Sequence, residues 1–234
     1  MLNKNIISIC GLKNSGKDST AKMIQFCLNS PKMFHHYWFY KHFNVFSEGK
    51  YKICRFADTL KQMLAVLLNV DVEEFEDRDF KENWFVDFTT LTLHYKTDVN
   101  SDKILTDNKF SKLAKELDPN LTQDYFLSVR QVLQFFGTQC MRTYFGDKIW
   151  ILSLFNQDYP HLIISDLRFK VELDEAIGHD SEVIYIYRPE CKPGSHASER
   201  ELVEIYEKRQ YHHLIKNDGD LKDLFNKVKE LVCQ

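Results

Sequence analysis

The chain has 234 residues, of which 44% are hydrophobic and 28% are charged, and its formal net charge is -3. This balance is typical of one globular domain with a sizeable core, and the slight negative charge disfavours a protein that grips nucleic acid through a broad basic surface. No apolar run approaches the length of a membrane span, and the six cysteines are far apart without a Cys-x-x-Cys pair. We therefore expect a cytoplasmic protein with reduced thiols and with neither nucleic acid nor membrane as a partner.

Five apolar runs recur along the chain, and a pattern with helical character follows each of them. The runs are 5–10, 51–56, 161–165, 182–187 and 212–217. The helical patterns are 17–28, 58–69, 169–177, 196–209 and 219–231, with two more helical stretches at 128–145 and 147–157. Continuous apolar runs are typical of strands that are buried on both faces. The alternation predicts an α/β fold of three layers, in which helices flank a five-stranded parallel sheet.

Two segments interrupt this alternation. Residues 30–50 carry an aromatic cluster, and residues 78–125 are polar and acidic with a strand-like patch at 84–95. Long excursions within a compact domain tend to be lids, binding arms or subunit contacts. We therefore expect a single domain, 1–234, with two insertions.

The first loop has the spelling of a phosphate-binding site. Residues 11–20 read GLKNSGKDST, which is Gly, four residues, and then Gly-Lys, between an apolar run and a helical pattern. Glycines let backbone N–H groups surround phosphate oxygens, and the start of the following helix favours an anion. Lys17 would add a positive charge at the phosphates. The stretch therefore predicts a P-loop.

Asp18 departs from the usual pattern, which has Ser or Thr at this position to hold magnesium. One interpretation is that the Asp18 carboxylate holds Mg²⁺ directly or through water, since hard cations favour oxygen ligands. The other is that Asp18 caps the helix, while Ser19 or Thr20 supplies a hydroxyl to the metal. The sequence leaves both interpretations open.

A second polar signal lies at the end of the third apolar run, where the chain reads HLIISDLRF. Asp166 resembles the acidic strand end that orients Mg²⁺ and water in P-loop enzymes, and Arg168 follows at the sheet edge where ligands of open α/β folds bind. The alternative is that Asp166 caps the next helix and that Arg168 pairs with Glu172 on its surface.

Polar residues that could bind a phosphoryl acceptor follow the second apolar run. Asp58 and Lys61 lie at its carboxyl end, and an otherwise apolar helical stretch, 128–142, carries further polar groups. Those groups are Arg130, Gln131, Gln134, Thr138 and Arg142. Spacings of three or four residues bring side chains to one helix face, which indicates polar groups aimed at a cleft. The alternative for each residue is an ordinary solvated side chain.

An ordered set of motifs resembles the bacteriophage-type deoxynucleoside monophosphate kinases, which are P-loop relatives of adenylate kinase. The motifs are GLKNSGKDSTA, FADTLK, SVRQVLQFFGT, DKIWI, ISDLRF, IYRP, HASE and IKNDGDLKDLF. Gly-Lys-Asp is a common P-loop spelling in that family, so Asp18 looks like a variant rather than a loss. The resemblance covers nearly the whole chain except 30–50 and 78–125.

The resemblance implies an enzyme with the P-loop kinase fold that transfers the γ-phosphate of ATP, with Mg²⁺, to a deoxynucleoside monophosphate (dNMP). The products would be the dNDP and ADP, the enzyme would work in the cytoplasm (of the host, for a viral protein), and a homodimer would fit the family. The implied lid covers approximately 188–210.

The resemblance also implies a role for each matching residue. For ATP the residues are Gly11, Lys13, Asn14, Ser15, Gly16, Lys17, Asp18, Ser19 and Arg188. For the acceptor they are Asp58, Lys61, Arg130, Gln131, Gln134, Thr138 and Arg142. For catalysis they are Lys17, Arg130, Arg142, Asp166 and Arg168, and for Mg²⁺ they are Asp18, Ser19 and Asp166.

Two other functions compete with this one. Animal phosphomevalonate kinases share a similar Lys-x-Ser-Gly-Lys-Asp loop and a Ser-Asp-x-Arg strand end, so the acceptor could be another small phosphorylated molecule. An ATP-binding switch without acceptor chemistry is the second competitor. The stretches LQFFGT and NDGDLKDLF favour a nucleotide acceptor.

Overall fold

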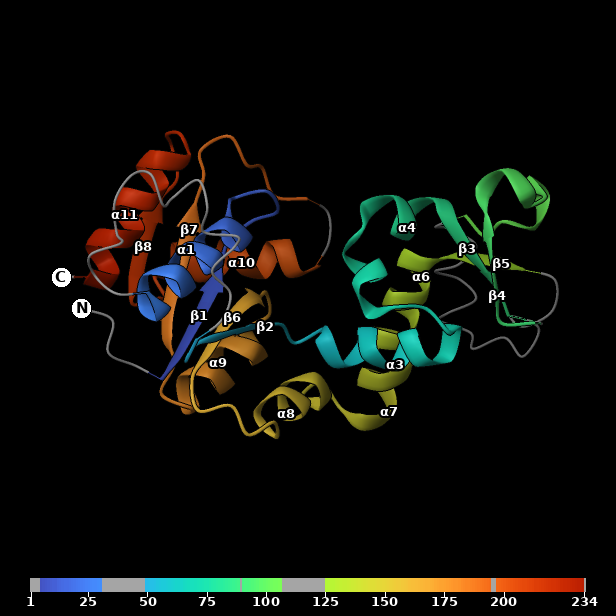
Figure 1. Cartoon of the computed structure of the whole chain (residues 1–234), viewed down its shortest axis with the longest axis horizontal. Helices are drawn as coiled ribbons and strands as arrows, with labels where there is room; N and C mark the ends of the chain where they lie inside the picture. Colours follow the sequence, from blue (N-terminus) through green and yellow to red (C-terminus); the bar gives the residue numbers. More distant parts are fainter. Residues whose placement is uncertain (1–4, 31–48, 89, 107–124, 195–196, 234) are drawn as a thin grey trace. The chain divides into compact units, whose positions relative to one another are not determined.

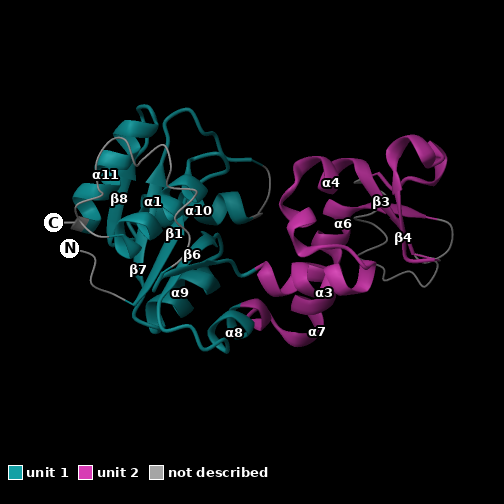
Figure 2. Ribbon diagram, viewed as in Figure 1, with its two compact units in different colours: residues 1–56, 151–234 teal, residues 57–150 magenta. Residues whose placement is uncertain are grey.

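The computed structural model describes residues 5–30, 49–88, 90–106, 125–194 and 197–233 (Figure 1). Most of the predicted insertion at 30–50 therefore lies outside the described residues. The chain forms two compact units, one of residues 1–56 and 151–234 and the other of residues 57–150 (Figure 2).

The first unit is built on a five-stranded sheet with the strand order β2-β6-β1-β7-β8. Its strands are β1 (Ile6–Cys10), β2 (Lys52–Cys54), β6 (Leu162–Leu167), β7 (Glu182–Tyr187) and β8 (His213–Lys216). Every neighbouring pair is parallel. The predicted α/β fold with a five-stranded parallel sheet is confirmed, and the strand that leads into the glycine loop lies at the centre of the sheet.

Helices flank this sheet (Figure 1). They are α1 (Lys17–Asn29), α9 (Lys170–Gly178), α10 (Ala197–Glu207), α11 (Leu221–Cys233) and most of α8 (Ile149–Phe155). Ile7 and Ile9 of β1 are fully buried in one cluster with Phe26 of α1 and Phe225 of α11. The rings of Phe26 and Phe225 lie 6.1 Å apart, so α1 and α11 meet over the central strand. Because helices cover the strands on both faces, the strands are continuous runs of mainly apolar residues.

The second unit combines short helices with a second sheet. Its helices are α3 (Asp58–Leu68), η3 (Val72–Glu76), α4 (Arg78–Asn83), η4 (Lys96–Asp98), η5 (Ser101–Lys103), α6 (Val129–Gln134), η7 (Phe135–Arg142) and α7 (Thr143–Phe145). The antiparallel sheet has the order β4-β3-β5, with β3 (Trp84–Asp87), β4 (Thr92–Tyr95) and β5 (Phe126–Ser128). The strand-like patch at 84–95 thus forms a hairpin, and β5 completes a sheet that the sequence did not predict.

The helical stretch predicted at 128–145 is not a uniform α-helix. It begins with a capping box, in which Ser128 Oγ accepts from the Gln131 N–H (3.3 Å) and Gln131 Oε1 accepts from the Ser128 N–H (2.9 Å). After α6 the backbone widens into the π-helix η7. The indole N–H of Trp150 donates to the Gly137 carbonyl within this wide turn (2.9 Å). Such π segments occur frequently at functional sites.

The second unit is larger than the insertion predicted at 78–125, because it also contains α3, α6 and η7. The first unit is therefore formed by two separate stretches of chain. In the described part of the chain, no helix has the length and the apolar character that crossing a membrane requires.

Candidate active site

The loop between β1 and α1 adopts a conformation that requires glycine. Gly11, Asn14 and Gly16 have positive φ angles of 144°, 64° and 101°. A Cβ atom at Gly11 would also collide with the backbone oxygen of Ile186 in β7 and lie 2.8 Å from Ser15 Oγ. The strand expected at 5–10, the glycine loop and the helix expected at 17–28 are present as β1, the connecting loop and α1. A glycine loop that leads into the start of a helix can bind an anion through its backbone N–H groups and the helix dipole.

Lys17 is the first residue of α1, and its side chain folds back over the loop. Its Nζ donates to the carbonyl oxygens of Gly11 and Leu12 at 2.7 Å each. Burial, and then the charge of Arg168, lower the pKa of Lys17 below that of an ordinary lysine, while Asp18 and Glu199 act in the opposite direction. A partly buried ammonium that donates to neutral carbonyls would gain an anionic partner when a phosphate binds.

Asn217 holds the loop from the far end of the chain, and sequence reasoning missed it. Its Nδ2 donates to the Ser15 carbonyl at 2.8 Å across 202 residues of sequence. Its own N–H donates to the carbonyl of Tyr187 (2.7 Å), which fixes Asn217 at the end of β7. A Cβ atom at Gly16 would lie 2.6 Å from Asn217 Nδ2. The sequence carried one signal, the family-like stretch IKNDGD after the last strand, but no spacing rule connects that stretch to the loop.

Asp166 lies at the end of β6 and connects this strand to its neighbour. Its Oδ1 accepts from the backbone N–H of Phe56, which follows β2 (2.9 Å). The alternative role as a helix cap is wrong, because buried Glu172 caps α9 instead. Glu172 Oε2 accepts from the N–H groups of Arg168 (2.8 Å) and Phe169 (3.0 Å).

Arg168 therefore binds Glu172 through its backbone, and its side chain is exposed. The charge of Arg168 is one of the causes that lower the pKa of Lys17, after burial. Within the described ranges, no carboxylate is within ion-pair distance of the Arg168 guanidinium. Two neighbouring cations repel each other unless an anion binds between them, so this end of the sheet favours a phosphate.

The candidates for a metal ligand differ in accessibility. The Asp18 side chain is 73% exposed, and its Oδ1 lies 3.6 Å from Arg55 Nη2. Thr20 is fully buried, and its hydroxyl donates to the Gly16 carbonyl (2.9 Å), so it is turned into the helix. Among the residues that the structure describes, no three His, Cys, Asp or Glu side chains are grouped to hold a metal ion. This donor set fits Mg²⁺ that is bound mainly by phosphates and water, with one or two protein oxygens.

The predicted lid, 188–210, includes α10. Glu199 of this helix accepts from the backbone N–H of Lys13 at 3.5 Å, which brings α10 to the glycine loop. Arg188 follows β7, and its Nε donates to the carboxylate of Glu190 (3.0 Å).

In the second unit, the two best-defined acceptor cations are already paired. Lys61 Nζ lies 2.6 Å from Glu76 Oε1 and 3.8 Å from Asp58 Oδ1. Arg130 contacts one oxygen of Glu82, Oε1, through Nε (2.8 Å) and Nη2 (2.7 Å). The two glutamates were not among the predicted site residues.

The remaining acceptor candidates lie on α6 and η7. Gln134 and Thr138 are exposed, and Arg142 is half-buried at the end of the π segment. Gln131 differs from them, because it is buried, takes part in the capping box and donates from Nε2 to the Leu105 carbonyl (3.0 Å). Its hydrogen bonds hold α6 in place.

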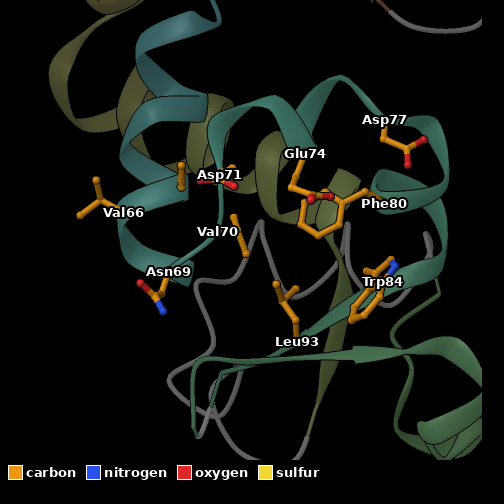
Figure 3. A pocket seen from close by; sticks show the side chains of 10 residues that line it. Val66, Asn69, Val70, Asp71, Glu74, Asp77, Phe80, Trp84 and Leu93 are labelled. Carbon is orange, nitrogen blue, oxygen red and sulfur yellow. The ribbon is translucent and has the colours of Figure 1, made fainter.

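A hollow of about 700 Å³ also lies in the second unit (Figure 3). Its lining is apolar with an acidic rim and consists of Ala65, Val66, Asn69, Val70, Asp71, Glu74, Asp77, Phe80, Trp84 and Leu93. None of the acceptor candidates contributes to this lining. Three carboxylates repel a phosphate, so the hollow is unsuited to a nucleotide.

Comparison with known proteins decides the family. Residues 49–228 match the model of the deoxynucleotide monophosphate kinase family. The chain belongs to this family. The match covers all of the second unit and begins after the glycine loop, so the loop geometry is separate evidence for a phosphate-binding site.

Two phage relatives align with the kinase over nearly its whole length. The deoxynucleotide monophosphate kinase of Enterobacteria phage T4 is 26% identical, covering 96% of this chain and 97% of the relative. The deoxynucleotide monophosphate kinase of Escherichia phage RB69 is 22% identical, covering 97% of this chain and 99% of the relative. A solved dephospho-CoA kinase from Campylobacter jejuni aligns over 98% of this chain and 96% of its own at 15% identity, with a TM-score of 0.39. The resemblance drawn from the sequence motifs is confirmed, and the chain is a nucleotide kinase.

Proposed function

We propose that this kinase transfers the γ-phosphate of ATP to the phosphate of a dNMP, with the donor phosphates on residues 11–19. The observation that carries this proposal is the glycine loop, in which the partly buried Lys17 donates to two carbonyl oxygens of its own loop. Family membership supplies the acceptor class, which the loop alone does not specify.

The reaction needs positioning and charge neutralisation rather than covalent catalysis. An oxygen of the acceptor phosphate attacks the γ-phosphorus, the bond from that phosphorus to the β,γ-bridging oxygen breaks, and ADP leaves with the electron pair. The attacking oxygen is already anionic, so no general base is required. Lys17 would exchange its two carbonyl partners for phosphate oxygens, and Arg168 would add a second positive charge.

We assign the metal ligand of the loop to Asp18. Its carboxylate is exposed in the first turn of α1, whereas the Thr20 hydroxyl is bonded within the helix. Bound Mg²⁺ supplies positive charge to the donor phosphates. Asp166, fixed by the Phe56 N–H, would contribute through ordered water at the same edge of the sheet.

For the acceptor phosphate we propose Lys61, Arg130 and Arg142, with Gln134 and Thr138 as contacts to the sugar or base. Two observations support this proposal. Lys61 and Arg130 carry positive charge on α3 and α6, with side chains that are 13% and 42% exposed, and the exposed polar side chains of α6 and η7 follow Arg130 on one helical stretch.

The test is a coupled assay of ADP release with Mg²⁺ and ATP, run with each dNMP, each ribonucleotide counterpart, phosphomevalonate and no acceptor. We expect ADP with one or more dNMPs, loss of activity in Lys17→Met, and full activity in the matched control Lys22→Met, an exposed lysine of the same helix. ADP release that is equal without an acceptor, or turnover of phosphomevalonate alone, would contradict the proposal.

A further inference from the structure

The two acceptor cations of the second unit receive their partners from one short stretch of chain, 76–82. Glu76, at the end of η3, binds Lys61 of α3, and Glu82, in α4, binds Arg130 of α6. The cations and the carboxylates thus come from different elements. Glu82 lies at the beginning of the predicted insertion 78–125, and Glu76 lies two residues before it.

The stretch is held firmly in the unit. Phe75 and Phe80 are buried, and their rings meet edge to face with centroids 5.5 Å apart. Asp77 caps α4 by accepting from the Asp79 N–H at 2.9 Å. The two glutamates therefore project from a fixed support, which is what a residue that orients another side chain requires.

The geometry at Arg130 leaves one edge of the guanidinium available. Glu82 uses a single oxygen to accept from Nε (2.8 Å) and to contact Nη2 (2.7 Å). A guanidinium has five N–H donors, and with respect to the described part of the chain both donors of Nη1 and one of Nη2 have no partner. This end edge has the fork geometry that binds two oxygens of a phosphate.

A role in folding stability does not explain the pair of Arg130 and Glu82. The side chains of Arg130 and Glu82 are both 42% exposed, and ion pairs of this exposure contribute little to stability. Holding a long side chain in one orientation, in contrast, lowers the ordering cost of binding a ligand.

We infer that Glu82 is a positioning residue, which holds the Arg130 guanidinium so that its end edge receives the acceptor phosphate. Glu76 does the same for the Lys61 ammonium, which is only 13% exposed. This inference rests on the proposed function, and it gives the beginning of the 78–125 segment a role in binding the acceptor.

The experiment compares steady-state kinetics of Glu82→Ala, Glu82→Gln and Arg130→Ala, with the dNMP and then ATP as the varied substrate. We expect Glu82→Ala to raise the KM for the dNMP about tenfold, with kcat and the KM for ATP nearly unchanged. Glu82→Gln keeps an oxygen in the same place and should restore much of the loss. Asp174→Asn, which removes an exposed ion pair with Lys170 on α9, is the matched control and should change nothing.

A double-mutant cycle distinguishes positioning from a general effect. If Glu82 acts through Arg130, Glu82→Ala should have no further effect on the KM in the Arg130→Ala background. An unchanged or lowered KM for the dNMP in Glu82→Ala, while Arg130→Ala raises it, would overturn this inference and leave the proposed function intact. An unchanged KM in Arg130→Ala would overturn both the acceptor site and this inference.

Discussion

The two units hold their key cations in different ways. Lys17 in the first unit donates to carbonyl oxygens five and six residues away in its own loop. Lys61 and Arg130 in the second unit donate to carboxylates 15 and 48 residues away. The contacts of the proposed donor cation therefore lie within a contiguous motif, whereas those of the proposed acceptor cations join separate segments. The kinase contains one site that can be recognised from residue spacing and one that cannot.

The largest effect expected from this comparison is that of Lys17→Met. In the proposed mechanism Lys17 neutralises charge on the phosphates, so its loss should lower kcat about 10³-fold with every acceptor. Arg130→Met should act mainly on the KM for the dNMP. Initial rates with both substrates varied would show the difference.

If Lys17→Met raised only the KM for the dNMP, the division between donor and acceptor sides would be wrong. Lys22→Met, on the exposed side of α1, controls for the loss of a lysine from this helix.

The same distinction explains what the sequence could predict. The strand β7 has the predicted bounds, 182–187, and α1 begins at the predicted residue, because strands buried on both faces and a glycine loop leave contiguous signals. The sheet of the second unit was missed, since β3 pairs with β5 across a long stretch of chain and both strands are short. Glu82 and Asn217 were missed for a related reason. A hydrogen bond between distant residues has no periodicity that a sequence could display.

Asn217 provides a second prediction, because it makes the donor loop depend on a distant residue. Asn217→Ala leaves the buried Ser15 carbonyl without its donor, which should lower the free energy of unfolding by about 1–3 kcal/mol. The KM for ATP should rise and that for the dNMP should stay unchanged. Thermal melting and kinetics against Asn226→Ala, an exposed asparagine of α11, would measure both effects. An unaltered KM for ATP would show that the loop keeps its shape without this tether.

A third prediction separates the two interpretations of Asp18. Asp18→Asn should raise the Mg²⁺ concentration that gives half-maximal activity about tenfold, because the loop loses a carboxylate that the metal can bind. Ser19→Ala should leave it nearly unchanged. Mg²⁺ titrations at fixed ATP provide the measurement. The reverse pattern would assign the metal ligand to the Ser19 hydroxyl instead of Asp18.

The smallest expected effect is a shift in a pH profile, and it examines the donor side most directly. Burial and the Arg168 charge lower the pKa of Lys17, so the ammonium is present at low pH and is lost as the pH rises through a value below that of an ordinary lysine. The pH dependence of kcat/KM for ATP reports the ionisations of the free enzyme, and kcat/KM should decline on the alkaline side as Lys17 loses its proton. Arg168→Gln removes one cause of the lowered pKa of Lys17 and should shift this alkaline decline to higher pH. A decline that stays in place would show that the two cations do not act on the same phosphate, and the donor side would then depend on Lys17 alone.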